Sequence, residues 1–205
     1  MNFSYGRAST RARLRLTAGL IVLKLCVTRL PNNVAIYETM FTPKSFNLVS
    51  LLPQDDCPEV RHGFLEALKK LLASGQLHQR WFTLCFLAAF EPNEEFKLNM
   101  VRWLKNRSEH YRSLFSLTAL TLGSIKYLVM EKTFPRLLHL LAHHTDFSTE
   151  DSDLEDMATY LNFYLDCVGT ADNYALFFHL AQRVKQARDT LDTEKSEVNR
   201  FYALV

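Results

Sequence analysis

A histidine cluster has the residue types and spacing that could bind a metal. His139 and His143 lie four residues apart, so both imidazoles could reach one metal from one helix, and His144 and Asp146 follow closely. However, no glutamate follows His139 as in an HExxH motif, and the leucines between the histidines are explained by packing. The sequence therefore favours a packed helix over a metal site, and we expect neither metal nor other cofactor.

Cys167 and His179 could in principle act as a nucleophile and its base. Cys167 lies in an apolar helical pattern, without the nearby positive charge that would favour a thiolate. The sequence also has no glycine-rich phosphate-binding loop, and the adjacent acids Glu155 and Asp156 are typical of a helix start beside a solvated loop. We expect no catalytic residue, so a small α-helical enzyme is the least favoured class of function.

A third set of residues could bind a protein partner. Arg183, Lys185 and Arg188 lie on the polar side of a helical pattern that runs from about Asn173 to Asp189. Three cations on one helix could meet an acidic segment of another protein. The alternative, that they form an ordinary solvated face, stays open.

The charges are distributed unevenly along a chain whose net charge is only +2. Six basic residues lie between Arg7 and Arg29, and no acid precedes Glu38. Between Leu137 and Gln182 there are eight acids and no lysine or arginine. The two regions either steer partners of opposite charge or are solvated surfaces. The small net charge gives no reason to expect sequence-independent binding of nucleic acid.

The composition favours long helices as the elements that position these residues. Of 205 residues 48% are hydrophobic and 22% charged, and six glycines and six prolines leave little material for turns. The four cysteines are widely separated among apolar neighbours, which predicts buried thiols in a reducing compartment. No apolar run approaches the roughly 18 residues that a membrane span requires, so we expect a soluble protein that does not enter a membrane.

Apolar residues recur with helical spacing along most of the chain, and no alternating pattern predicts strands. The first predicted helix is so densely apolar that we expect burial on more than one side. The fold class is therefore all-α, a HEAT/armadillo-like α-α superhelical solenoid fragment, with a closed bundle as the alternative. We expect one helical-repeat segment over 1–205, disorder over 1–8, an acidic loop over 145–152 and no clear assignment over 108–131. The predicted helices cover residues 9–29, 43–52, 58–74, 77–90, 94–106, 134–143, 154–168, 173–189 and 201–205. The helix over 58–74 has the clearest apolar stripe, and we expect Gly75 to end it. The stripe consists of Val60, Phe64, Leu65, Leu68, Leu71 and Leu72.

The turn before residue 58 resembles the HEAT-repeat turn, in which an aspartate stands five residues before a Val-Arg pair. Here Asp55 precedes Val60 and Arg61. The carboxylate can cap the start of the next helix and approach the arginine, while the valine begins the buried stripe. An ordinary acidic cap is the alternative interpretation.

Three longer segments resemble one family. The stretch from Lys132 to Phe147, which contains LLHLLAHHTDF, is similar to a segment of the fungal sister chromatid cohesion cofactors of the precocious-dissociation-of-sisters type. The segment from Leu154 to Arg188 resembles the next helix pair of that family, and Leu14 to Cys26 resembles an earlier helix. The three segments follow one another in the family's order.

The resemblance implies a nuclear HEAT-repeat regulator of cohesin, active in the cell cycle, cell division and DNA repair and associated with chromatin indirectly. Its implied partners are the cohesin kleisin subunit, the releasing factor and the acetyltransferase. A family helix over Leu14 to Cys26 makes a mitochondrial presequence the less favoured alternative. An unrelated HEAT-repeat adaptor, such as a transport or phosphatase scaffold, is the alternative function.

Two features depart from the family. Its members are several times longer, so we expect a fragment or a truncated gene model. The stretch from Ser116 to Met130 matches poorly and could reflect a retained intron.

Overall fold

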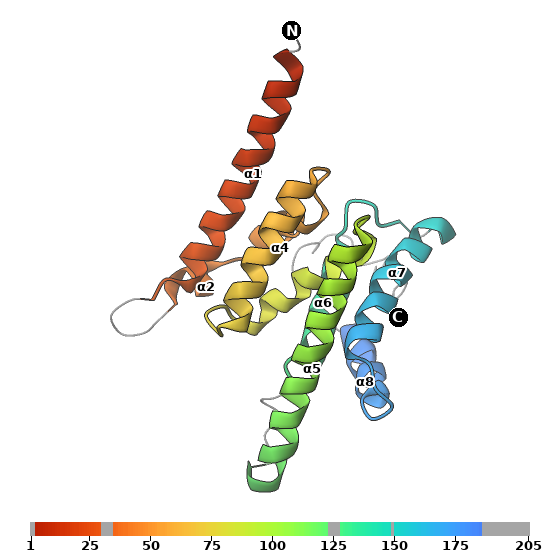
Figure 1. Ribbon diagram of the computed structural model, residues 1–205. Coiled ribbons are helices and arrows are strands. Elements are labelled where there is room, and N and C mark those ends of the chain that lie inside the picture. Colours follow the sequence, from red (N-terminus) through yellow and green to blue (C-terminus); the bar gives the residue numbers. More distant parts are fainter. Residues whose placement is uncertain (1–2, 30–34, 123–127, 149, 186–205) are drawn as a thin grey trace. The chain divides into compact units, whose positions relative to one another are not determined.

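The computed structural model describes residues 3–29, 35–122, 128–148 and 150–185 (Figure 1). Within these ranges all regular structure is helical, which confirms the all-α, HEAT/armadillo-like solenoid class. The chain divides into two compact units, unit 1 (Met1–Ala88) and unit 2 (Ala89–Val205). No helix in the described ranges has both the length and the apolar character to cross a bilayer.

Unit 1 is built around the long helix α1 and the amphipathic helix α4. The side chains of the predicted stripe on α4 are buried, except that Leu71 is only half-buried. Gly75 adopts a φ of 68° just after α4, a conformation that glycine permits and other residues resist, and so ends the helix as expected. The elements are α1 (Phe3–Val27), α2 (Ile36–Met40), α3 (Pro43–Val49), η1 (Leu52–Gln54), α4 (Pro58–Ala73) and the 3-10 helix η2 (Gln79–Phe90), whose last two residues belong to unit 2.

Helices α1 and α4 run parallel and approach closely where glycines face the neighbouring element. A Cβ atom on Gly19 would collide with Leu52 and lie 3.1 Å from the ring of Phe64. On α4, a Cβ atom on Gly63 would lie 3.0 Å from Leu16. The missing side chains therefore allow the two helices to pack at short distance.

The expectation that α1 is buried on more than one side is wrong. Leu14, Ile21 and Leu25 remain 64%, 51% and 41% exposed, and their spacing of seven and four residues places them on one stripe. The main neighbours of α1 in unit 1 are α2, η1 and α4, which lie on its other face. A high apolar content shows that a helix has neighbours but does not show how many faces they cover.

A buried ion pair joins α2 to the start of η2. Arg80 Nε lies 2.7 Å from Glu38 Oε1, and a second guanidinium nitrogen donates to the Glu38 carbonyl oxygen at 2.8 Å. The indole N–H of Trp81 donates to Glu38 Oε2 at 2.9 Å. The rings of Phe41 and Phe46 lie beside Trp81, each 5.3 Å away between centroids. The carboxylate is thus fixed from both sides in apolar surroundings.

Unit 2 consists of helices in which alternate elements pack together. Helix α5 contacts α7 and helix α6 contacts α8, as expected for stacked helix pairs. Helix α7 begins three residues before the predicted start, and α5 continues far into the unassigned stretch 108–131. The predicted helix over 201–205 lies outside the described residues. The elements are α5 (Glu94–Leu122), η4 (Glu131–Thr133), α6 (Phe134–Ala142), α7 (Asp151–Val168) and α8 (Tyr174–Lys185).

Candidate functional site

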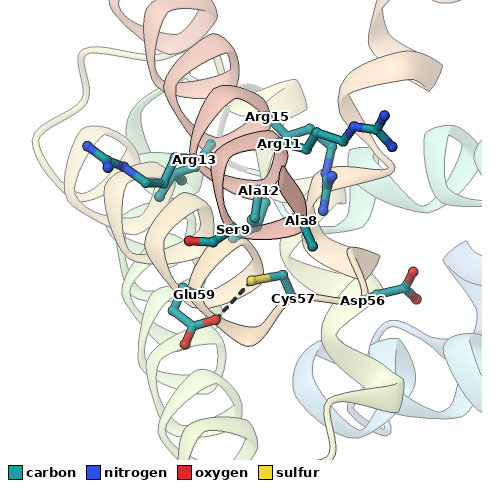
Figure 2. A pocket seen from close by; sticks show the side chains of 11 residues that line it. Ala8, Ser9, Arg11, Ala12, Arg13, Arg15, Asp56, Cys57 and Glu59 are labelled. Carbon is teal, nitrogen blue, oxygen red and sulfur yellow. Dashed lines mark hydrogen bonds between the residues drawn. The ribbon is translucent and has the colours of Figure 1, made fainter. Parts of the chain in front are cut away.

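A groove of about 750 Å³ lies in unit 1 between the N-terminal half of α1 and the start of α4 (Figure 2). The α1 residues that face it include Ala8 and Ala12, one helical turn apart, with Leu16 a turn further on. On the N-terminal side of Leu16, where α1 contacts α4 closely, the alanine side chains are too short to fill the space beside α4. The groove therefore results from small residues on α1. The other lining residues are Ser9, Arg11, Arg13, Arg15, Asp56, Cys57, Glu59 and Val60.

Arginines stand on both flanks of the groove. Figure 2 shows Arg11 and Arg15 on one side of the Ala8 and Ala12 pair and Arg13 on the other. In the described part of the chain, neither Arg11 nor Arg13 has an acidic side chain within ion-pair distance. Both side chains belong to exposed residues, so two cations at the groove are available to a ligand.

Arg15 is paired with the turn that leads into α4. Its Nε and one terminal nitrogen donate to the two carboxylate oxygens of Asp55, at 2.5 and 2.7 Å. Asp55 Oδ1 also accepts the backbone N–H of Cys57 at 3.0 Å. Burial opposes ionisation of Asp55, but the bonds from Arg15 and Cys57 and the charge of Arg61 outweigh it and hold its pKa below the usual value.

The predicted HEAT-like turn is present, but two of its contacts differ from the prediction. Asp55 accepts the backbone N–H of Cys57, the residue before α4, and no side chain caps the first turn of the helix. Val60 is 1% exposed and begins the buried stripe, as expected. The Arg61 side chain binds the backbone of the turn and donates to the carbonyl oxygens of Asp55 and Asp56 at 2.6 and 3.2 Å. The principal partner of the Asp55 carboxylate is Arg15, 40 positions earlier. Sequence spacing gave no indication of this contact.

Cys57 lies at the groove and is the one cysteine of the four that is not fully buried. Its thiol donates to Glu59 Oε2 at 2.9 Å, the bond drawn in Figure 2, and this contact lowers the pKa of Glu59. Burial raises the pKa of Cys26 to about 12, and burial also raises the pKa of Cys85. Cys57 is therefore the thiol most open to chemical labelling.

The histidine cluster is packed into unit 2. The rings of His139 and His143 lie 4.8 Å apart between centroids, and His144 Nδ1 accepts the backbone N–H of Asp146 at 3.2 Å. Burial lowers the pKa of His144, which favours the neutral ring. Among the described residues no three metal-ligand side chains gather. The contacts agree with packing, and the absence of a metal stays a prediction.

Cys167 and His179 differ in their surroundings. Cys167 is 3% exposed, and burial raises its pKa to about 12, which opposes formation of a thiolate. His179 is exposed on α8. Neither environment favours an activated nucleophile.

The predicted partner-binding residues are only partly described. Arg183 is exposed on α8. Lys185 ends that helix, but its side chain lies outside the described residues, as does Arg188. The geometry of this set is therefore not tested, and its role stays a prediction.

The packing of alternate helices, α5 with α7 and α6 with α8, defines the class of the protein as a helical-repeat segment of the HEAT/armadillo type. Residues 3–205 match the family model described as sister chromatid cohesion protein PDS5. The chain belongs to this PDS5 family.

Relatives from fungi and animals support the assignment. The chain is 34% identical over 184 residues to sister chromatid cohesion protein pds5 of Schizosaccharomyces pombe, covering 89% of the chain and 14% of the relative. It is 32% identical over 190 residues to PDS5 of Saccharomyces cerevisiae, covering 88% and 14%. It is 28% identical over 196 residues to PDS5 homolog A of Homo sapiens, covering 93% and 14%. The chain thus spans about one seventh of the length of these relatives.

Proposed function

We propose that the chain is a non-catalytic scaffold that regulates cohesin in sister chromatid cohesion by binding other proteins. The observation that carries this proposal is the PDS5 family match over residues 3–205. The names of the fungal relatives, which call them sister chromatid cohesion proteins, support the same role. Stacked helix pairs also provide long exposed ridges suited to extended partners. The corresponding location is the nucleus, in association with chromatin.

The proposed partners are the cohesin kleisin subunit, the cohesin releasing factor and the cohesin acetyltransferase. The family resemblance supports each of them. The alternative of an unrelated HEAT-repeat adaptor for transport or for a phosphatase receives no support from the relatives, whose names all refer to sister chromatid cohesion.

Affinity purification of the tagged 205-residue chain from dividing cells tests this function. We expect cohesin subunits to be enriched, as measured by quantitative mass spectrometry. A matched control carries Leu68→Pro, which breaks the centre of α4 at a fully buried position and should abolish capture. Recovery of transport or phosphatase complexes in place of cohesin would refute the proposal.

The basic residues Arg183, Lys185 and Arg188 are a proposed contact of this scaffold with an acidic partner segment. The support is their sequence spacing together with the exposure of Arg183. Reversal of all three charges, Arg183→Glu, Lys185→Glu and Arg188→Glu, should reduce the yield of cohesin in the same purification. An unchanged yield would exclude this contact while leaving the scaffold function intact.

A further inference from the structure

The groove between α1 and α4 combines an apolar floor with separated positive charges. Ala8 and Leu16 provide the accessible apolar surface, and the buried side chains of Ala12 and Val60 lie beneath it. The groove has a volume of about 750 Å³. Cavities of this size with a few charged groups at the edge are typical of ligand sites. An apolar side chain of a partner could therefore be buried between the two helices.

The two available arginines stand on opposite sides of this floor (Figure 2). Arg11 lies on one flank and Arg13 on the other, with Ala12 between them in the sequence and in the view. A ligand that crosses the floor would meet one guanidinium at each side. The arrangement fits two carboxylates separated by an apolar group, because each guanidinium can bind a carboxylate through two hydrogen bonds.

Two acids line the α4 side of the groove and limit which ligands fit. Glu59 is engaged by the Cys57 thiol, and both Glu59 and Asp56 lie at the N-terminal end of α4, where the helix dipole partly offsets negative charge. A nucleic acid, with a charge at every phosphate, would still be repelled here. A ligand with few acids can direct them towards α1.

We propose that the groove binds an extended peptide with one acidic residue two positions before an apolar residue and another two positions after it. Alternate side chains of an extended chain point to the same face, so all three can face the groove. The peptide directs its acids to Arg11 and Arg13 and buries its apolar side chain against Ala8 and Leu16. Arg15 is held by Asp55 and contributes to the wall of the groove instead of to ligand binding. This inference rests on the proposed protein-binding function and locates one site for it.

The position of Cys57 provides a direct measure of occupancy, since it lines the groove and the other three cysteines are buried. The probe is a fluorescein-labelled synthetic peptide, Glu-Gly-Leu-Gly-Asp, and its control is Gln-Gly-Leu-Gly-Asn. Alkylation of Cys57 by iodoacetamide is followed by peptide mass mapping of the full chain. At a peptide concentration of ten times Kd, measured by fluorescence anisotropy, we expect Cys57 to react about tenfold more slowly.

Charge variants test the role of the arginines. The double variant Arg11→Glu, Arg13→Glu should weaken peptide binding by about tenfold or more and remove the protection of Cys57. Arg11→Lys, Arg13→Lys keeps the charge and should lose only about threefold, because lysine does not bind a carboxylate through two fixed donors. The matched control Lys24→Glu, Arg102→Glu makes the same change in net charge at exposed positions outside the groove and should leave binding unchanged.

Several outcomes would overturn the inference. Peptide binding without protection of Cys57 would place the peptide elsewhere, and equal protection by the neutral control peptide would refute the role of charge. Protection by a DNA or RNA oligonucleotide instead of the acidic peptide would assign the groove to nucleic acid. Absence of peptide binding, with cohesin still captured by the chain, would reject the groove and retain the scaffold function. Absence of cohesin capture would instead reject the scaffold function.

The urea midpoint of each variant, compared with the unchanged chain, verifies that the variant is folded.

Discussion

Among the described residues of unit 1, the Glu38–Arg80 and Asp55–Arg15 pairs share the same chemistry and differ in exposure. In the pair of Glu38 with Arg80 the side chains are 10% and 17% exposed. In the pair of Asp55 with Arg15 they are 8% and 45% exposed, because the arginine lies in solvent beside the groove. Both pairs join segments about 40 residues apart in the chain, at separations of 42 and 40 positions.

The difference predicts unequal contributions to stability, because the cost of breaking an ion pair rises with burial. The two carboxylates are similarly buried, and the arginines differ. A largely buried arginine that loses its carboxylate keeps a large desolvation cost, whereas an exposed arginine exchanges its carboxylate for water with little change. The pair of Glu38 and Arg80 is therefore expected to stabilise the contact between α2 and η2. The pair of Asp55 and Arg15 orients the turn before α4 and helps to form the wall of the groove.

Glu38→Ala should have the largest effect on stability. It leaves Arg80 and the indole N–H of Trp81 without the carboxylate, and we expect the free energy of unfolding to fall by about 3 kcal/mol. Urea unfolding followed by tryptophan fluorescence measures this change in a Trp103→Phe background, where Trp81 is the only reporter. Glu38→Gln, which keeps the shape and can still accept the indole N–H, should lose less.

Asp55→Asn should have a smaller effect on the same measurement. The amide oxygen can still accept the N–H of Cys57, while the charged bonds from Arg15 are weakened, so we expect a loss of about 1 kcal/mol. The comparison between the two pairs fails if Asp55→Asn destabilises unit 1 as much as Glu38→Ala.

The contribution of Asp55 should depend on pH. Its pKa is lower in the folded chain than in the unfolded chain, so the folded state favours the ionised form. Its stabilisation is complete above the unfolded value of about 3.9 and is lost as the pH falls through the lower folded value. Urea unfolding between about pH 6 and pH 3 should show the difference between the unchanged chain and Asp55→Asn shrinking towards acid. A constant difference would contradict the assignment.

The double variant Arg11→Glu, Arg13→Glu should have the smallest effect on stability. These side chains have no acidic partner within ion-pair distance in the described part of the chain, so their reversal breaks no ion pair there. We expect the urea midpoint to stay unchanged. A large loss would show that the groove arginines serve the fold and would remove the contrast with Glu38.

Local patterns predicted much of unit 1, because spacing along one helix determines which residues share a face. The buried stripe that starts at Val60 and the role of Gly75 both follow from such patterns. The Asp55 turn was predicted through its resemblance to HEAT repeats, but the contact with Arg15 depends on how two distant helices pack. Glu38 gave no signal, since a lone acid in a short helix is usually exposed.

The groove itself was not predicted for a related reason. Ala8 and Ala12 are ordinary helix residues in the sequence, and a hollow appears only when α4 is placed beside them. The error on α1 has the same origin, because the apolar content of a helix does not reveal the number of its neighbours. The set of Arg183, Lys185 and Arg188 is a pattern on one helix and stays a prediction.

The exposed stripe of Leu14, Ile21 and Leu25 gives the isolated chain an apolar ridge along α1, one of several exposed apolar sites among the described residues. Because water is a poor solvent for such a ridge, two copies gain by placing their ridges together as the protein is concentrated. Light scattering should therefore report a rising average mass with concentration. Glutamine at these three positions should keep the chain monodisperse.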